Sequence, residues 1–228
     1  MNLAIVKYNA GNVCSVVNAF RRLGVEPLVT DVADELTSAD RVVFPGQGEA
    51  SSAMEYLKAH RLDEVIVNLK QPLLGICIGM QLLCRHSEEG DTKCLGIFDV
   101  DVKRFQPKSH NEKVPQMGWN SLSPVLSTAG TDGQPTVNPL FNGLQTLSEG
   151  VEEALPFVYF IHSYYVPICQ ETIGTTDYIQ PYSSALHKDN FYATQFHPEK
   201  SGRVGEQILR NFLNLSCPTS IGSDAKSG

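Results

Sequence analysis

Cys77 lies at the centre of a five-residue pattern that is typical of catalytic nucleophiles. Residues 75–79 read Gly-Ile-Cys-Ile-Gly, with an apolar run before them and a helical pattern after them. This is the thiol version of the nucleophile elbow, in which glycines on both sides relieve the crowding of a tight strand-to-helix turn. The start of a helix beside the sulfur favours a thiolate over a thiol. The pattern alone does not exclude a structural cysteine, because free cysteines are commonly small buried hydrophobic residues.

A thiol nucleophile needs a base, and the base needs a partner that holds its ring. Residues 195–200 read Gln-Phe-His-Pro-Glu-Lys and follow the last expected strand. His197 and Glu199 are two residues apart, so an extended backbone would point both side chains to one side. We therefore expect Cys77, His197 and Glu199 to form a catalytic triad. A zinc site is not expected, because no further Cys or His stands at a suitable spacing.

Alternating strands and helices must position these residues. Apolar runs predict strands over residues 3–7, 27–30, 41–44 and 73–76, and helical spacing predicts helices over 13–23, 49–58, 62–69 and 78–85. The second half is richer in strands, over residues 98–104, 157–165, 183–188 and 191–195, and it closes with a helix over about 204–213. Such alternation implies an α/β fold with a doubly wound, mainly parallel sheet flanked by helices. The thiol would project from the carboxyl ends of the strands, where open α/β proteins bind ligands.

Composition and charge restrict the class of protein. The chain has 228 residues, 42% of them hydrophobic, and a net charge of -7. We expect one domain over residues 1–215, a polar tail over 216–228 and a surface loop over 127–139. The acidic chain lacks a Lys and Arg cluster, so nucleic acid is not an expected partner. No stretch approaches the roughly 20 apolar residues of a membrane span, and we expect a cytoplasmic location. The six cysteines form no Cys-x-x-Cys pair, so we expect no disulfide framework, metal or cofactor.

Three motifs, in order along the chain, resemble those of the class I (triad type) glutamine amidotransferases. They are Pro-Gly-x-Gly at 45–48, Gly-x-Cys-x-Gly-x-Gln at 75–81 and Phe-His-Pro-Glu at 196–199. The segment 113–120, Lys-Val-Pro-Gln-Met-Gly-Trp-Asn, is similar to one branch of that family, the glutaminase subunits of imidazole glycerol phosphate synthases. The resemblance covers roughly residues 1–215 and implies a flavodoxin-like amidotransferase domain.

The resemblance implies an enzyme that hydrolyses glutamine. Cys77 would attack the side-chain amide carbon of glutamine and form a γ-glutamyl thioester. His197 would take the thiol proton, pass it to the departing ammonia and then activate the water that releases glutamate. Glu199 would fix the imidazole tautomer and stabilise its charged form.

The tetrahedral intermediate of this reaction carries an oxyanion that needs preorganised donors. The backbone N–H of Ile78 is one candidate. The second would come from the loop of Gly46, Gln47 and Gly48, whose glycines permit a backbone N–H to turn inward. Related subunits usually carry an aliphatic residue where this chain has Gln47, and a polar side chain there could alter how easily the loop turns.

Four further residues are expected to bind the substrate. Gln81 lies one helical turn after Cys77 and is suited to the amino-acid end of glutamine. The family further implies that Glu89 holds the substrate amino group and that the backbone at His162 and Ser163 contacts the substrate. A solvated helix surface is the alternative for both Gln81 and Glu89. For Glu89 alone, the second carboxylate directly before it, Glu88, adds weight to that alternative.

The resemblance also implies a protein partner, because ammonia released to water would be protonated and lost. The family docks on a (β/α)8-barrel synthase subunit as a heterodimer, and the barrel carries ammonia to a second active site. That site makes imidazole glycerol phosphate and an aminoimidazole carboxamide ribonucleotide for histidine biosynthesis. The only tryptophan of the chain lies in segment 113–120, which we expect to be a loop at this interface. The expected partner-facing residues are Pro115, Met117, Gly118, Trp119 and Asn120.

Three alternatives stay open at this point. The same glutaminase chemistry could serve a paralogue that aminates surface-sugar precursors. A cysteine peptidase on a similar scaffold would share the elbow but has no need of Gln81. A binding or redox-sensing protein would use Cys77 only as a reactive thiol, which the combination of His197 and Glu199 disfavours.

Overall fold

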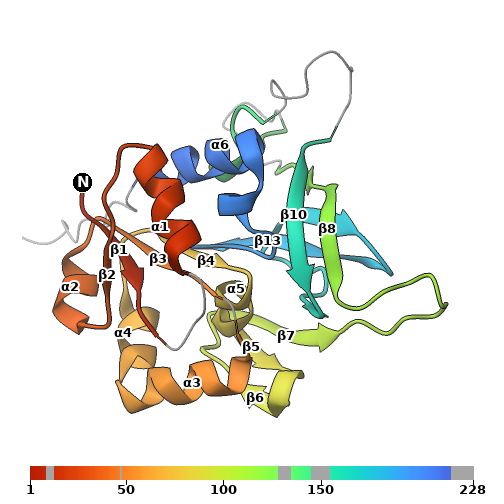
Figure 1. Cartoon of the computed structure of the whole chain (residues 1–228), viewed down its shortest axis with the longest axis horizontal. Helices are drawn as coiled ribbons and strands as arrows, with labels where there is room; N and C mark the ends of the chain where they lie inside the picture. Colours follow the sequence, from red (N-terminus) through yellow and green to blue (C-terminus); the bar gives the residue numbers. More distant parts are fainter. Residues whose placement is uncertain (9–12, 47, 128–134, 145–154, 217–228) are drawn as a thin grey trace, which may run out of the picture.

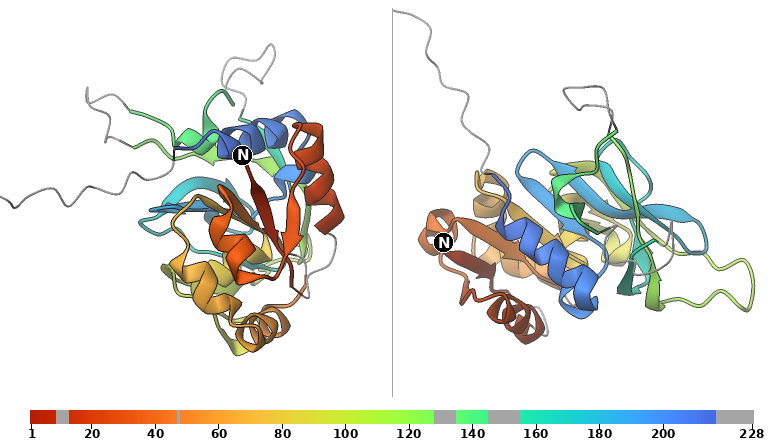
Figure 2. Two further views of the ribbon diagram at one scale, coloured as in Figure 1. Left: turned by 90° about the vertical axis from the view of Figure 1, so that its left-hand side faces the viewer. Right: turned by 90° about the horizontal axis from the view of Figure 1, so that it is seen from above.

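The computed structural model describes residues 1–8, 13–46, 48–127, 135–144 and 155–216 (Figures 1 and 2). Its centre is an eight-stranded sheet in the order β2-β1-β3-β4-β14-β13-β12-β9. The parallel part comprises β1 (Leu3–Val6), β2 (Leu28–Thr30), β3 (Arg41–Phe44), β4 (Leu73–Ile76) and β14 (Phe191–Thr194). The sheet continues antiparallel through β13 (Pro181–Lys188), β12 (Thr172–Asp177) and β9 (Ser123–Pro124). The predicted α/β class is confirmed, with a sheet that is parallel in one half and antiparallel in the other.

Helices cover both faces of the parallel strands (Figure 1). One face carries α1 (Val13–Arg22) and α6 (Gly202–Leu213), and the other carries α2 (Ala33–Ser38), α3 (Ala50–Ala59) and α4 (Leu62–Asn68). Successive strand residues point to opposite faces, so β1 contributes Ile5 to the core under α1 and α6, and Val6 to the core under α3 and α4. Phe20 and Phe212 are fully buried in the first core, and each such burial contributes about 1.5–3 kcal/mol.

Two smaller sheets lie beside the main one (Figure 1). The pair of β8 (Gln116–Ser121) and β10 (Phe157–His162) is antiparallel. A four-stranded sheet has the order β11 (Tyr164–Tyr165), β7 (Phe98–Arg104), β5 (Cys84–Ser87) and β6 (Thr92–Lys93). The remaining elements are the short helix α5 (Ile78–Leu83) and the 3-10 turns η1 (Glu89–Asp91), η2 (Pro139–Phe141) and η4 (Pro198–Lys200).

The structure corrects the sequence prediction in two places that matter for the site. The helix expected over 78–85 ends at Leu83, because the chain enters β5 at Cys84. The segment around Trp119, expected as a loop, is strand β8 and pairs along its whole length with β10. Strand β12 and helix α2 were also not predicted. Strand β8 contains a glycine and no β-branched hydrophobic residue, and its partner β10 lies about 40 residues later in the sequence, so a distant strand decides its conformation.

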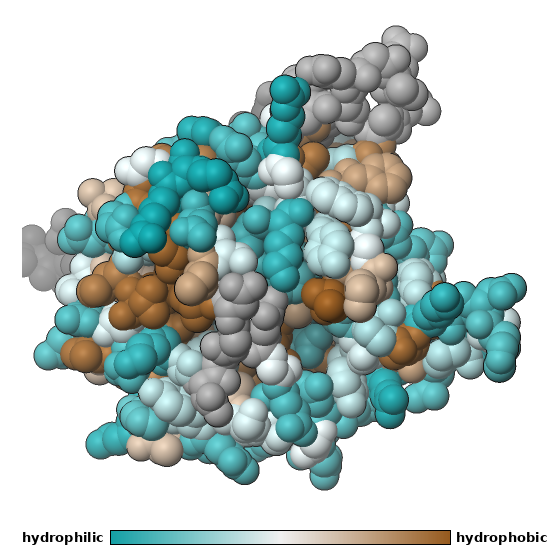
Figure 3. Space-filling model, in the orientation of Figure 1, coloured by the Kyte–Doolittle hydropathy of each residue, from teal (hydrophilic) through white to brown (hydrophobic). Residues whose placement is uncertain are grey.

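The described helices and the exposed hydrophobic side chains bear on how the molecule meets its surroundings. No helix within the described ranges is long and apolar enough to span a bilayer. Figure 3 shows a hydrophobic area on the side of the molecule where Figure 1 places the β2 edge of the large sheet, and Leu28, Val29 and Val32 are exposed there. The centre of the predicted surface loop, residues 128–134, and most of the predicted tail, residues 217–228, lie outside the described residues.

Candidate active site

The carboxyl ends of the parallel strands bring the predicted residues to one edge of the sheet. β3 ends at Phe44 and leads into the Pro-Gly-x-Gly motif, β4 leads directly into Cys77, and β14 leads to His197. The Cys77 N–H donates to the Thr194 oxygen at 2.7 Å, which joins the nucleophile to the end of β14. Segments more than 100 residues apart in sequence therefore meet at one place.

Cys77 occupies a strained elbow. Its φ of 55° and ψ of -109° lie outside the regions that L-residues normally adopt. The flanking glycines permit this turn, because a Cβ on Gly79 would lie 2.0 Å from the Phe44 oxygen and one on Gly75 3.0 Å from the Gly79 backbone. The glycine spacing is thus a steric requirement of the turn.

The predicted oxyanion loop crosses directly over the start of α5. A Cβ on Gly46 would lie 1.7 Å from Cγ2 of Ile78, so only glycine fits there. The Tyr8 hydroxyl donates a hydrogen bond to the Pro45 oxygen and thereby holds the first peptide of the loop. Burial raises the pKa of Tyr8, with a further contribution from Cys77, so this hydroxyl keeps its proton. Gln47 lies outside the described residues.

His197 and Glu199 form a buried pair. Nδ1 of His197 lies 2.8 Å from Oε1 of Glu199, and the two side chains are 1% and 3% exposed. The spacing of His197 and Glu199 predicts an extended backbone between them, but Glu199 lies in the 3-10 turn η4, which begins at Pro198. The turn, rather than strand alternation, brings the carboxylate under the ring. Because Nδ1 is bound to Glu199, Nε2 is the nitrogen left for the thiol.

The charges around His197 favour its imidazolium form. Burial lowers its pKa, but Cys77 and Glu199 more than offset this effect, and the pKa is raised to about 10. A cationic imidazole beside Cys77 stabilises a thiolate, the reactive form of the nucleophile. The arrangement places a cationic imidazole beside the Cys77 sulfur.

Nine of the predicted residues line one cavity of about 400 Å³. They are Gly48, Cys77, Ile78, Gln81, Glu89, Pro115, His162, Ser163 and His197. Glu199 lies behind His197 and is not among the residues that line the cavity. Pro115, expected at the partner interface, also lines this cavity. Ile161 and Tyr164 also line it, and sequence reasoning did not single them out.

Gln81 is a buried residue, which excludes the solvated helix surface considered for it. It is 3% exposed, and its Nε2 donates to the Tyr164 oxygen at 3.1 Å and to Oε1 of Gln195 at 3.0 Å. Gln195 in turn donates from Nε2 to the Cys77 sulfur at 3.7 Å. The motif over residues 195–200 predicts no role for Gln195, although a polar residue at the end of a buried strand is a signal that could have identified it.

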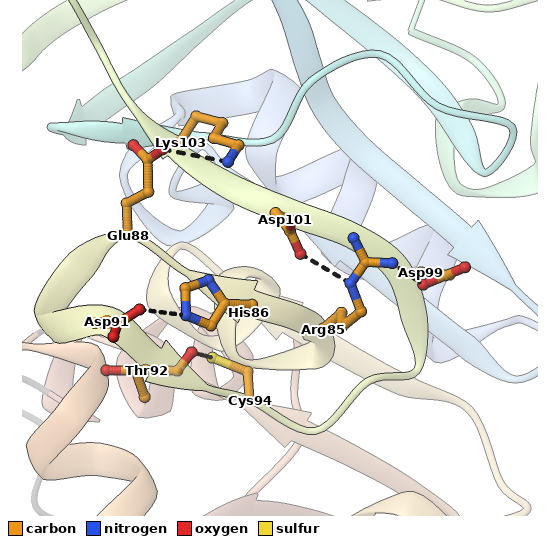
Figure 4. Close-up of polar contacts among 9 residues, drawn as sticks. All are labelled: Arg85, His86, Glu88, Asp91, Thr92, Cys94, Asp99, Asp101 and Lys103. Atoms are coloured by element: carbon orange, nitrogen blue, oxygen red, sulfur yellow. Dashed lines mark hydrogen bonds and ion pairs between the residues drawn. The ribbon is translucent and has the colours of Figure 1, made fainter.

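Glu88 and Glu89 separate in the structure. Glu88 forms an ion pair with Lys103, while Arg85 contacts Asp99 and Asp101 nearby (Figure 4). These exposed pairs contribute little to stability. Glu89 turns the other way, lines the cavity and accepts a hydrogen bond from the Ala50 N–H at 2.9 Å. Its half-buried position raises its pKa, partly offset by the Ala50 N–H.

His162 is fixed as a neutral ring in the cavity wall. Its Nδ1 lies 2.7 Å from the Tyr164 oxygen and its Nε2 lies 3.3 Å from the Tyr182 hydroxyl. Burial lowers its pKa to about 4. The Tyr182 hydroxyl, which has one proton to donate, also lies 3.0 Å from Oε1 of Gln116, and Gln116 begins strand β8. A buried series of polar contacts, from His162 through Tyr182 to Gln116, thus joins the wall of the cavity to β8.

The remaining residues of the predicted partner segment are on the surface of β8. Met117 is 64% exposed and Trp119 is 55% exposed, which excludes a core role for the tryptophan. Gly118 has a φ of 134°, and Asn120 donates to the Asp177 oxygen at 2.9 Å. An exposed aromatic and a methionine on one strand are typical of an interface core.

The described residues contain no group of three or more His, Cys, Asp or Glu side chains that could hold a metal ion. Cys14, Cys77, Cys84, Cys94 and Cys169 are free thiols. Of these five, Cys77 alone lies in the cavity with His197.

Comparison with known proteins gives consistent matches along nearly the whole chain. The family model described as Glutamine amidotransferase class-I matches residues 4–215. The imidazole glycerol phosphate synthase subunit HisH of Bacteroides thetaiotaomicron is 58% identical over 215 residues, which are 94% of this chain and 100% of that protein. The subunit of the same name from Idiomarina loihiensis is 39% identical over 216 residues, 95% of this chain and 99% of that protein.

Solved structures match the fold. A glutamine amidotransferase structure aligns with a TM-score of 0.65 at 16% identity and covers 92% of this chain and 97% of that chain. A glutamine amidotransferase from Thermotoga maritima aligns with a TM-score of 0.57 at 17% identity and covers 94% of this chain and 83% of that chain.

Proposed function

Because the chain belongs to the class-I glutamine amidotransferase family, we propose that it is the glutaminase subunit of an imidazole glycerol phosphate synthase. The observation that carries this proposal is the cavity in which Cys77, His197 and Gln81 meet, with Glu199 buried behind the histidine. Each of these residues has a chemical task in hydrolysing glutamine to glutamate and ammonia.

The reaction begins at the Cys77 sulfur. The thiolate attacks the carboxamide carbon of glutamine, and the C=O electrons move to the oxygen to form a tetrahedral oxyanion. His197 donates a proton to the amide nitrogen, the C–N bond breaks, and ammonia leaves a γ-glutamyl thioester. Neutral His197 then removes a proton from water, the hydroxide attacks the thioester carbon, and the C–S bond breaks to release glutamate and restore the thiolate. Glu199 stabilises the charged imidazole in both halves.

The oxyanion is stabilised by backbone donors. The Ile78 N–H, at the first residue of α5, is one, and an N–H of the loop over residues 46–48 is the second. Tyr8 holds the start of this loop through the Pro45 oxygen. We expect weak activity for the isolated subunit, because we propose that partner binding brings the loop N–H to the oxyanion.

The amino-acid end of glutamine binds at Glu89 and Gln81, which also line the cavity. Glu89 supplies a carboxylate for the α-ammonium group, and Gln81 supplies an amide beside it. Backbone groups at His162 and Ser163 complete the contacts. The half-buried position of Glu89 strengthens its attraction to a cation, because both charges are partly removed from water.

Ammonia passes to a partner, which we propose to be a (β/α)8-barrel synthase subunit bound as a heterodimer. The exposed side chains of Met117 and Trp119 supply the centre of the interface. Met117 and Trp119 belong to strand β8, and Pro115 lies one residue before it. Pro115 also lines the catalytic cavity, so the proposed interface adjoins the site where ammonia forms.

The decisive variant for the chemistry is Cys77→Ser in the complex with the barrel subunit of the same organism. We expect glutamine-dependent synthesis to be lost and ammonia-dependent synthesis to be retained, because the barrel site is untouched. Cys14→Ser, which replaces an exposed free thiol, is the matched control and should leave both activities unchanged. Glutamine-dependent activity that survives in Cys77→Ser would refute the assigned nucleophile.

The interface is tested by Trp119→Ala against Ile168→Ala. The two side chains are 55% and 56% exposed, so their replacement removes comparably exposed apolar surface. We expect the tryptophan variant to weaken binding of the barrel subunit at least tenfold, as for an interface anchor, and the isoleucine variant to bind normally. If titration calorimetry gave the two variants equal affinities for the barrel subunit, the proposal that β8 lies in the interface would be refuted.

The acceptor of the ammonia is tested in cells. We expect the chain, expressed with its barrel subunit, to restore growth of a strain that lacks its own imidazole glycerol phosphate synthase. Failure to grow without histidine, despite good expression of both subunits, would favour a surface-sugar amidotransferase.

A further inference from the structure

Gln195 is a fully buried amide whose two ends contact two different parts of the active site. Its backbone N–H donates to the Ser184 oxygen at 2.8 Å, which fixes the residue just after β14. Its Nε2 donates to the Cys77 sulfur at 3.7 Å, and its Oε1 accepts from Nε2 of Gln81 at 3.0 Å. Gln195 is 0% exposed, so no solvent contact explains a polar residue there. Buried amides are retained where their hydrogen bonds are made.

The contact with Gln195 decides which atom Gln81 presents to the cavity. A primary amide has two N–H donors, and Gln81 uses them on Tyr164 and Gln195. Its carbonyl oxygen, Oε1, is therefore the polar atom left for a ligand in the cavity that Gln81 lines. An oxygen acceptor suits the α-ammonium group of glutamine and not its α-carboxylate. Rotation of the amide by half a turn would present a donor instead and reverse this preference.

The contact with Cys77 depends on the state of the sulfur. An N–H donor stabilises a thiolate more than a thiol, because hydrogen bonds to charged acceptors are stronger than those to neutral ones. In the thioester the sulfur carries no charge and the contact weakens. The same N–H therefore favours the thiolate as the attacking group and again as the group that leaves when water breaks the thioester. The His197 imidazolium favours the same thiolate form of the sulfur.

We propose that Gln195 is a positioning residue that sets both the thiolate of Cys77 and the amide orientation of Gln81. The proposal rests on the proposed function, since it assumes that Cys77 is the nucleophile and that the cavity binds glutamine. The buried Gln195 side chain then links the stability of the Cys77 thiolate to the binding of the substrate's amino group.

The test uses two alkylating probes on the full chain. Iodoacetamide reports on the thiolate alone, and its reaction is followed at the Cys77 peptide by mass spectrometry across a range of pH. The glutamine analogue 6-diazo-5-oxonorleucine alkylates the nucleophile after binding as an amino acid, so its half-saturating concentration reports on recognition. The variants are Gln195→Met and Gln81→Met, which keep volume and remove the amide.

For Gln195→Met we expect changes both in the pH midpoint of iodoacetamide alkylation and in the half-saturating concentration of the glutamine analogue. Loss of one hydrogen bond to a charged group changes an equilibrium by roughly tenfold, so the pH midpoint of iodoacetamide alkylation should rise by about one pH unit. The half-saturating concentration of the glutamine analogue should rise about fivefold to tenfold, since Gln81 loses its fixed orientation. Gln81→Met should raise the half-saturating concentration but leave the midpoint near that of the original chain.

Gln71→Met is the matched control, because the Gln71 amide donates to the Leu36 oxygen away from the cavity. Gln71→Met should change neither the pH midpoint of alkylation nor the half-saturating concentration of the glutamine analogue. An unchanged midpoint in Gln195→Met would overturn the proposal, and a lowered melting temperature without a midpoint shift would reduce Gln195 to a packing residue. Cys77→Ser separates this result from the proposed function. If that variant loses glutaminase activity while Gln195→Met behaves as the original chain, only the role of Gln195 is wrong. If Cys77→Ser retains activity, the proposed function fails as well.

Discussion

The backbone at Cys77 predicts an inverted order of stability between glycine and alanine. The φ of 55° and ψ of -109° suit glycine and strain any residue with a Cβ. Strain of this kind costs on the order of 1–3 kcal/mol. At ordinary positions glycine is less stable than alanine by roughly 0.5–1 kcal/mol, because it loses more backbone entropy on folding. The two effects oppose each other at this position, and the strain is the larger.

Cys77→Gly should therefore be more stable than Cys77→Ala by about 1 kcal/mol. Both variants lack the sulfur, so the lost contacts of the thiol cancel in the comparison and the Cβ is the difference between them. For a chain of this length, 1 kcal/mol corresponds to a melting temperature higher by roughly 2–4 °C. Neither variant should hydrolyse glutamine, so stability and activity are separated at one residue.

The assay is urea unfolding followed by circular dichroism, with thermal melts as a second measurement. Ala53→Gly is the control, because Ala53 is buried inside helix α3, where glycine should cost about 1 kcal/mol in the usual direction. A glycine variant at position 77 that is less stable than the alanine variant would refute the strained elbow. It would also weaken the argument that the flanking glycines exist to permit it.

Three further predictions concern the elbow, the oxyanion loop and the cavity wall. Gly79→Ala should lower the free energy of unfolding by at least about 2 kcal/mol, since its Cβ would lie 2.0 Å from the Phe44 oxygen; urea unfolding that matches the original chain would contradict this. Tyr8→Phe removes the hydrogen bond to the Pro45 oxygen, so glutaminase turnover without the partner should rise severalfold, and turnover that stays constant or falls would show that this bond does not restrain the loop. His162 has a pKa lowered from 6.5 to about 4, so the unfolded chain takes up its proton first as pH falls. The stability contributed by neutral His162 is complete above pH 6.5 and should fall by about 2 kcal/mol between pH 7 and pH 5. His162→Asn should lose this part of the slope in urea unfolding at the two pH values, and an unchanged slope would contradict the buried neutral ring.

The features that sequence reasoning predicted well are those set by local geometry. The glycines around Cys77 are required by contacts with neighbouring backbone, and such constraints leave a short, readable pattern. The pairing of His197 with Glu199 is also local, since a single 3-10 turn joins them. The parallel strands β1, β3 and β4 are buried along their length because helices cover both of their faces, and all their residues except Arg41 at the start of β3 are apolar or glycine.

The features that were missed depend on contacts between distant parts of the chain. Trp119 lies in a strand because β8 pairs with β10, some 40 residues later in the sequence, and its own residues carry little strand preference. The role of Gln195 depends on Gln81, which is 114 residues away. Glu88 and Glu89 could not be told apart from their order, because an exposed partner, Lys103, turns one of them away from the cavity.

The central claim is that Cys77 becomes covalently attached to the γ-carbonyl of glutamine. The most direct measurement mixes the complex with glutamine, quenches the reaction in acid during turnover and examines the digested peptides by mass spectrometry. The account predicts a glutamyl adduct on the peptide that contains Cys77, lost in Cys77→Ser and when glutamate replaces glutamine. An adduct on another cysteine, or glutamine turnover that persists in Cys77→Ser, would contradict it.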